Sequence, residues 1–311
     1  MTFLLLPDDN QIYTIKIYLR LILYLFVPGI FIYILINIFN VPHLTYVRAD
    51  KREYENYYFL YYSLSTVHFR FFSIFDEPGV VGSLSAMVVM YYRKFLSKRE
   101  YIAFICAGFL SFSLFFIVTF PIIYYFSDIR YIPYQKRVKK LFTCALILVV
   151  FYFSFILAIT QFINNPIIQF GIYNRFKWEN GLIVGMVNNR DILPGFDESY
   201  TSFVERNEAD LWLGKGKNSV ADEFGASGLS YRISIYEKGI LIVLYMLGLI
   251  ILMHPWHRQF IFSLVSVIFI LMLLFQRTLF FKIDYFSLLF IGSGIITKYA
   301  KKENSTYNTE P

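Results

Sequence analysis

Three arginines lie where polar segments of the chain meet long apolar ones: Arg70, Arg175 and Arg232. A guanidinium group binds phosphate oxygens well because its planar fork donates two parallel N–H bonds. Two carboxylates, Asp76 and Glu77, follow the first arginine just before an apolar segment begins. A cation and a carboxylate in this position would face the boundary of a bilayer, where lipid-linked phosphates lie. One interpretation of this stretch is therefore a site for such a phosphate.

The same stretch also has a purely structural interpretation. Pro78 and Gly79 suit a turn into a helix, and carboxylates just before them would favour the positive end of the helix dipole. In that case Arg70 and the aromatic residues around it anchor the chain at a membrane interface. The local sequence supports both interpretations equally.

The long polar segment 163–232 repeats the pattern. Arg175 follows an apolar segment, Lys215 and Lys217 lie in a Trp-Leu-Gly-Lys-Gly-Lys stretch, and Glu237 stands where the chain becomes apolar again. Taken singly, each charge is more often solvated, or lies along apolar surface with its head in water. Taken together, they place several cations at one face, with acids close by.

The elements that must position these residues are runs of apolar sequence. The chain of 311 residues is 57% hydrophobic and only 16% charged, and its runs are apolar on every helical face. About 20 apolar residues span a bilayer as a helix. We therefore expect an all-α fold, a polytopic transmembrane helical bundle that forms a single integral membrane domain. The expected membrane runs lie near residues 17–39, 79–96, 101–127, 141–162, 233–253, 259–276 and 283–298.

The basic residues predict how these runs are oriented. Short loops rich in Lys and Arg stay in the cytoplasm, and such clusters follow the runs 79–96 and 101–127. The polar segments 40–78 and 163–232 carry mixed charge, and we place them outside as periplasmic loops, the second of them large. The sequence thus predicts a multi-pass protein of the bacterial inner (cytoplasmic) membrane.

The run 101–127 raises a problem of length, because basic clusters flank it on both sides. A helix of 27 residues covers only about 40 Å and cannot cross a bilayer twice. We favour a broken hairpin with its turn near Ser111 and Ser113, since both polar loops then fall on one side. A single long span that ends at Pro121 is the alternative.

Motifs of soluble enzymes and metal centres are missing from the sequence. The stretch Gly214–Lys217 lacks the first glycine of a phosphate loop, and the four histidines and two cysteines show no metal-ligand spacing. The net charge of +7 is explained by the cytoplasmic clusters, so nucleic acid is not an expected partner. We expect neither a cofactor nor a metal site.

Three stretches of the chain resemble the bacterial O-antigen polymerases, within the wider group that also contains the O-antigen ligases. The first joins Phe69-Arg70 to Phe75-Asp76-Glu77-Pro78-Gly79-Val80-Val81-Gly82. The second is Phe109-Leu110-Ser111-Phe112-Ser113, although Leu114 stands where an arginine is common. The third is Trp212 to Lys217, followed by Ser230 to Gly239. The resemblance covers roughly residues 60–300.

The resemblance implies an all-helical membrane glycosyltransferase. Such enzymes join oligosaccharide units carried on undecaprenyl diphosphate at the periplasmic face. The arginines would then stabilise the leaving diphosphate and a carboxylate, first of all Glu77, would accept the proton of the sugar hydroxyl. The implied catalytic residues are Arg70, Asp76, Glu77, Arg175, Arg232 and Glu237, and the implied substrate-binding residues are His68, Lys215, Lys217 and Tyr231. The implied partners are the undecaprenyl-diphosphate-linked oligosaccharide, the lipid bilayer and a chain-length regulator protein.

Two other functions remain as alternatives. An O-antigen ligase would transfer the glycan to lipid A core, but ligases typically use a histidine in the large periplasmic loop, and 163–232 has none. A transporter or flippase usually carries ionisable residues inside its helices. The runs 141–162 and 259–276 carry no charge, which disfavours that alternative.

Overall fold

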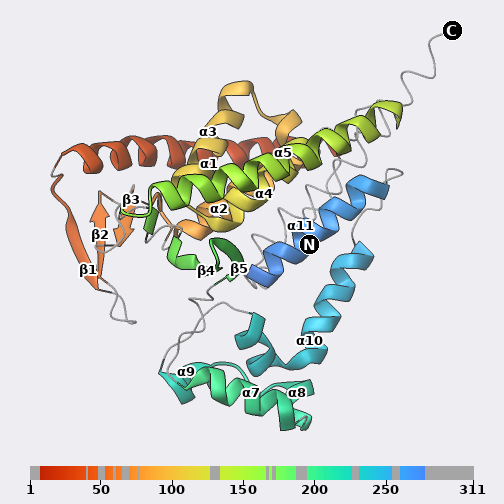
Figure 1. The fold of residues 1–311 in the computed structure, drawn as a ribbon. Helices are drawn as coiled ribbons and strands as arrows, with labels where there is room; N and C mark the ends of the chain where they lie inside the picture. Colours follow the sequence, from red (N-terminus) through yellow and green to blue (C-terminus); the bar gives the residue numbers. More distant parts are fainter. Residues whose placement is uncertain are drawn as a thin grey trace. The chain divides into compact units, whose positions relative to one another are not determined.

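The computed structural model of the chain describes most of its residues. These are 8–39, 41–47, 53–58, 61–64, 70–75, 77–126, 134–165, 168–169, 173–186, 195–206, 208–225, 231–253 and 260–276. The chain divides into two compact units, one of residues 1–174 and 291–311 and one of residues 175–290. Each unit is described by itself below (Figure 1).

The first unit begins with the long helix α1 (Asp8–Ile38), which is apolar on both faces. One face is buried, with Leu19 and Phe26 fully enclosed. The opposite face exposes large apolar side chains, and Tyr24 and Phe31 are 71% and 63% exposed. In the part of the chain that the structure describes, α1 is the one helix long and apolar enough, over Asn10–Ile38, to cross a membrane.

Helix α2 (Pro78–Tyr91) forms the centre of the first unit. Every residue of α2 except Val80 is buried, and the helix packs against both α3 (Lys98–Leu110) and α4 (Leu114–Phe126). A helix that is apolar all round finds no water-facing side and is stable only inside other elements. Pro78 at the first turn explains where α2 begins, because its fixed φ suits that position.

Helices α3 and α4 are separated by a break at Ser111–Ser113, where Phe112 has a φ of +45°. The aromatic rings of Phe109 and Phe120 lie 4.8 Å apart, although a straight helix would separate these residues by about 16 Å. The chain therefore turns back at the two serines, the position that the sequence analysis gave for a hairpin turn.

Arg93, in the 3-10 turn η2 (Arg93–Phe95), brings the outer ends of this hairpin together. Its guanidinium carbon lies 5.3 Å from the ring centre of Tyr101 in α3 and 5.3 Å from that of Tyr124 in α4. The start of α3 is further fixed by a capping box, in which Ser97 and Glu100 bond to each other's backbone N–H. Glu100 is also paired with Arg20 of α1 at 3.3 Å.

The structure is mostly helical, as expected, but it also contains a small antiparallel sheet that the expectation of an all-α fold did not include. Strands β1 (Leu44–Val47), β2 (Glu53–Tyr57) and β3 (Tyr61–Leu64) pair in the order β1-β2-β3, with Leu44 opposite Asn56 and Tyr57 opposite Tyr61. They lie in a segment rich in tyrosine, which favours pleated structure. Hydropathy detects membrane runs and overlooked these short strands. The predominance of helix itself is confirmed.

Helix α5 (Tyr134–Gln161) completes the helices described for the first unit and packs against α4. Both halves of α5 expose large apolar side chains, among them Phe142 and Leu157 at 74% and 66%. The predicted run 283–298 lies outside the described residues.

The second unit contains a second pair of strands, β4 (Phe176–Glu179) and β5 (Leu182–Met186), which form an antiparallel hairpin. Like the first sheet, it lies in a segment that was expected to be a loop. Three short helices follow, α7 (Phe196–Arg206), α8 (Ala209–Leu213) and α9 (Ser219–Phe224), and all three contact the first half of α10 (Tyr231–Met253). Helix α11 (Phe260–Gln276) packs against α10.

The three short helices enclose a small core. Its fully or nearly fully buried members come from α7, α8, α9 and α10, namely Phe196, Phe203, Leu211, Val220, Ile233 and Tyr236. The Phe203 and Tyr236 rings lie 4.7 Å apart and the Phe196 and Tyr236 rings 5.6 Å apart, which is the range of favourable aromatic pairs. The segment between the apolar runs is therefore folded, and we call α7, α8 and α9 with the start of α10 the loop substructure.

Candidate functional site

Arg70 lies at the break between α3 and α4. Its Nε donates to the carbonyl oxygen of Ser111 at 3.2 Å, and its Nη2 donates to that of Phe112 at 3.4 Å. The neighbouring backbone N–H of Phe71 donates to the carbonyl of Leu110 at 2.9 Å. These carbonyls end a helix, where the backbone presents partial negative charge and favours a cation. The guanidinium thus fixes the turn of the hairpin.

Strand β3 holds the Arg70 segment from its other side. The Tyr61 hydroxyl donates to the Arg70 carbonyl at 2.9 Å, and the Tyr62 N–H donates to the Ser73 carbonyl at 2.8 Å. The Tyr61 ring is fully buried and stacks on Phe71 with centres 5.8 Å apart. Burial raises the pKa of Tyr61, so this hydroxyl keeps its proton and remains a donor. The backbone around Arg70 is consequently held on two sides.

The start of α2 packs against the same turn. A Cβ added to Gly82 would lie 2.1 Å from the Ser113 Cβ, so α2 and the break approach as closely as a glycine allows. Ser111 and Ser113 are buried, and the Ser111 hydroxyl donates to the Gly108 carbonyl at 2.7 Å. Two of the stretches that carry the family resemblance, 69–82 and 109–113, are therefore in contact.

Glu77 precedes α2 as its N-cap residue, with extended backbone and no side-chain capping bond to the helix. The carboxylate is thus near the positive end of the α2 dipole, as the sequence predicted, without capping it directly. Asp76 and His68, the other predicted site residues of this segment, lie outside the described residues.

The third stretch of the resemblance also folds into one place, in the second unit. The backbone N–H of Lys215 donates to the Tyr236 carbonyl at 2.8 Å, and that of Gly216 donates to the Glu237 carbonyl at 3.0 Å. We call this arrangement, with its two glycines at 214 and 239, the glycine crossing. It joins the end of α8 to α10 through backbone atoms.

The two glycines are required by this crossing. Gly214 and Gly239 have φ values of +82° and +79°, a region that residues with a Cβ rarely adopt. A Cβ on Gly239 would lie 2.2 Å from the Trp212 carbonyl oxygen, and one on Gly214 would lie 2.4 Å from the Glu237 carbonyl oxygen. Gly239 also interrupts the helical backbone of α10. Its φ explains the kink at that point.

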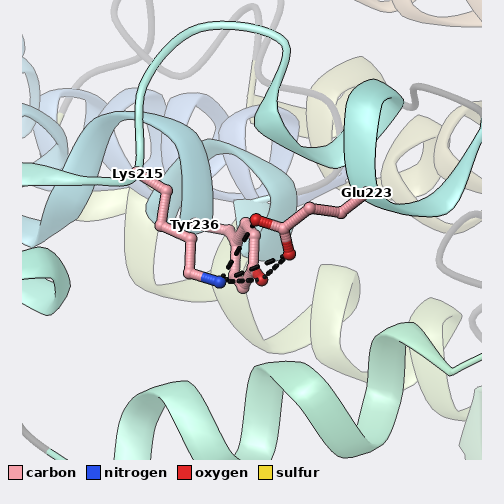
Figure 2. A network of polar contacts seen from close by, with 3 residues as sticks. All are labelled: Lys215, Glu223 and Tyr236. Carbon is pink, nitrogen blue, oxygen red and sulfur yellow. Dashed lines mark hydrogen bonds and ion pairs between the residues drawn. The ribbon is translucent and has the colours of Figure 1, made fainter.

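The side chains of Lys215, Glu223 and Tyr236 form a polar network (Figure 2), and Lys215 and Tyr236 also belong to the crossing through their backbone. The Lys215 Nζ lies 3.3 Å from each carboxylate oxygen of Glu223 and donates to the Tyr236 hydroxyl. The Tyr236 hydroxyl donates to Glu223 Oε2 at 2.6 Å. Burial acts to lower the pKa of Lys215, but its bonds to Tyr236 and Glu223 outweigh burial and raise the pKa. The ammonium is accordingly charged and held by a carboxylate.

Arg232 is engaged in a similar way at the first turn of α10. Its guanidinium donates to Asp197 of α7 and lies 4.4 Å from the Tyr200 ring centre and 5.5 Å from that of Phe196. A guanidinium that lies over aromatic rings and donates to a carboxylate combines a cation–π interaction with a charge-assisted hydrogen bond. Arg232 therefore links α10 to α7.

The remaining predicted residues of this unit lie on or beside the same elements. Tyr231 begins α10 and is partly buried, Glu237 is partly buried beside the crossing, and Lys217 is exposed. Arg175 ends the 3-10 turn η4 (Tyr173–Arg175) just before β4, and its side chain is not described.

The ten predicted site residues fall in both units. His68, Arg70, Asp76 and Glu77 belong to the first, and Arg175, Lys215, Lys217, Tyr231, Arg232 and Glu237 belong to the second. Sequence reasoning missed the partners of the cations, which are Asp197, Glu223 and Tyr236. No local pattern marks them, since they lie between 8 and 35 residues from the cations that they bind. Within the described residues, no group of three or more His, Cys, Asp or Glu could hold a metal ion.

Comparisons with known proteins add no relative. No protein-family model, no curated protein and no solved structure matches the chain.

Proposed function

We propose that this chain is a multi-pass protein of the bacterial inner membrane that polymerises undecaprenyl-diphosphate-linked oligosaccharide units at the periplasmic face. One observation carries the proposal. The stretches that resemble the O-antigen polymerases lie far apart in sequence and pack in pairs, 69–82 against 109–113 and 212–217 against 230–239. Residues that serve a common site are expected to be brought together in this manner.

The exposed surfaces of the long helices support a membrane location. Helices α1, α5, α10 and α11 each present large apolar side chains outward, for example Tyr24, Phe142, Leu244 and Ile268. Soluble monomers rarely expose contiguous apolar surface of this kind, whereas a bilayer covers it. The surface of α1 in particular is not that of a core helix, since only 22% of its apolar window is buried.

The chemistry of Arg70 supports a role with phosphate. Its two bonds at the helix break are to backbone carbonyl oxygens, and these bonds orient the guanidinium. A preoriented cation stabilises negative charge that develops on a leaving group, here the lipid diphosphate, at little cost in reorganisation. Lys215 and Arg232 are each bound to a carboxylate that ties together helices of the second unit. We therefore assign Arg70 the leading part and the other two a structural part in the loop substructure.

The test is polymerisation by the purified full chain in vesicles that contain an undecaprenyl-diphosphate-linked repeat unit. The wild type should produce a ladder of glycan lengths, and Arg70→Ala should lower the rate by about 10²–10³. Arg70→Lys should rescue poorly, because an ammonium does not reproduce the bidentate fork. Arg99→Ala is the matched control, since Arg99 is an exposed arginine of the same unit, on α3.

Cells that lack the chain distinguish polymerase from ligase. Loss of a polymerase should leave lipid A core with a single repeat unit, seen as one band just above core on a lipopolysaccharide gel. Bare core, with long glycans retained on the undecaprenyl carrier, would overturn the proposal.

A further inference from the structure

Helix α8 ends with two apolar side chains that the loop substructure leaves outside its core. Trp212 is 43% exposed and Leu213 is 66% exposed, although Leu211 beside them is buried. A large aromatic and a large aliphatic side chain thus lie together, exposed, at the tip of a five-residue helix.

The glycine crossing fixes where these two side chains lie along α10. The carbonyl of Trp212 and the backbone of Leu213 are the nearest atoms to the position of a Cβ on Gly239. The sequence of α10 also changes from charged to apolar at Gly239, because Glu237 and Lys238 precede it and apolar residues follow. Trp212 and Leu213 are consequently held at the level where α10 passes from polar to apolar.

Beyond that level α10 exposes apolar side chains continuously. Its outward residues include Leu241, Ile242, Leu244 and Tyr245, the last 65% exposed. Under the proposed function this surface faces lipid, and the exposed tip of α8 meets α10 at Gly239, where this surface begins. Lys217, four residues after Leu213 and exposed, would then meet the phosphates of the headgroups.

We propose that Trp212 and Leu213, with Lys217, form an interfacial foot that rests the loop substructure on the bilayer that α10 enters. Tryptophan favours this zone, where its ring contacts apolar chains and its N–H reaches water. The foot holds α7, α8 and α9 at the membrane surface, close to lipid-linked substrates. The inference rests on the proposed membrane location and adds the surface by which the loop touches the lipid.

Depth-dependent fluorescence quenching tests the foot in the full chain. The sequence has three tryptophans, so Trp178→Phe with Trp256→Phe leaves Trp212 as the reporter. The protein is reconstituted in vesicles of phosphatidylcholine and phosphatidylglycerol, with the acyl chains brominated near their top or near their end. Trp212 should lose more emission with the shallow bromines than with the deep ones, and iodide should quench it little.

A second reporter separates this inference from the proposed function. Tyr245→Trp, in a chain whose three native tryptophans are replaced by Phe, places the probe on the exposed apolar face of α10. If that probe is quenched by brominated lipid while Trp212 responds only to iodide, the foot is disproved and the membrane location stands. If neither probe is quenched by brominated lipid, both the foot and the proposed membrane location are wrong.

Discussion

The hairpin turn of the first unit and the glycine crossing of the second unit both bring distant segments together, but they use different atoms. At the hairpin turn, side chains make most of the contacts beside one backbone bond from Phe71 to Leu110: the Arg70 guanidinium binds two carbonyls, and Ser113 fills the space beside Gly82. At the crossing, backbone meets backbone, with amides of 215 and 216 bonded to carbonyls of 236 and 237. A contact made by side chains can be altered or released one group at a time. A contact between backbone atoms has no side-chain group that could be exchanged, so it changes only when the backbone itself moves.

Under the proposed function, this difference predicts on which region activity depends. The guanidinium of Arg70 would act on a phosphate from its place on the two carbonyls, while the packing through α2 holds the hairpin. The crossing, by contrast, sets the height of the loop substructure along α10 and has no side chain to exchange. We therefore expect substitutions at the crossing to cost stability first and substitutions at Arg70 to cost activity first.

The largest effect is expected from Gly239→Ala. The added methyl group would lie 2.2 Å from the Trp212 carbonyl oxygen in a backbone with a φ of +79°, and relief would break the bonds made by the amides of 215 and 216. We expect a loss of about 3 kcal/mol of unfolding free energy, as strain and overpacking add. Thermal unfolding of the detergent-solubilised protein measures it.

Gly225→Ala is the matched control for that experiment. Gly225 has a φ of +72° as well, but nothing lies within 4 Å of an added Cβ. Its cost should be about 1 kcal/mol, the strain of the left-handed backbone alone. Equal losses for the two alanine variants would contradict the close approach at the crossing.

An intermediate effect is expected from Gly82→Ala in the first unit. Its methyl group would lie 2.1 Å from the Ser113 Cβ, and we expect a loss of about 2 kcal/mol from overpacking. Since the obstacle is a side chain, Ser113→Gly in the same chain should recover more than half of that loss. A double-mutant cycle on unfolding free energies measures the coupling.

The rescue sharpens the contrast between the regions. Shortening Trp212 to Ala should give no such recovery for Gly239→Ala, because the obstacle there is a carbonyl oxygen. Recovery in both regions would show that side chains control the crossing too.

The smallest effect is expected from Lys215→Met. The ammonium is bonded to Glu223 and Tyr236, yet about a third of its side chain is exposed, so the pair should contribute less than about 1 kcal/mol. The pKa of Lys215 is raised above its ordinary value of 10.5. A group with a raised pKa in the folded state gives stability that is complete below its unfolded pKa and is lost as the pH rises through the folded value.

The difference in stability between wild type and Lys215→Met should therefore be constant at neutral pH and should shrink above pH 10.5. Chemical unfolding at a series of pH values measures it. Lys217→Met, which removes an exposed lysine two residues away, is the control and should show no such trend. A difference that grows with pH would contradict the assigned network.

Much of the helical framework could be read from the sequence alone. The apolar runs 17–39, 141–162 and 259–276 correspond to α1, α5 and α11, and Pro78 marks the start of α2. The turn at Ser111–Ser113 could be predicted too, because the run 101–127 is too short for two full spans and basic clusters flank it on both sides. These features depend on hydropathy, helix length and local backbone preference, which neighbouring residues determine.

The strands, and the partners that the charged side chains bind, were decided by tertiary structure. Strands β1 to β5 lie in segments that hydropathy treats as loops, and short strands gain their stability only from the partner with which they pair. Arg70, Lys215 and Arg232 were identifiable as cations, but Ser111, Glu223 and Asp197 were not identifiable as their partners. Gly239 shows the limit most clearly. In the sequence it is one glycine at the edge of an apolar run, and only the approach of the Trp212 backbone in the folded chain makes a side chain there destabilising.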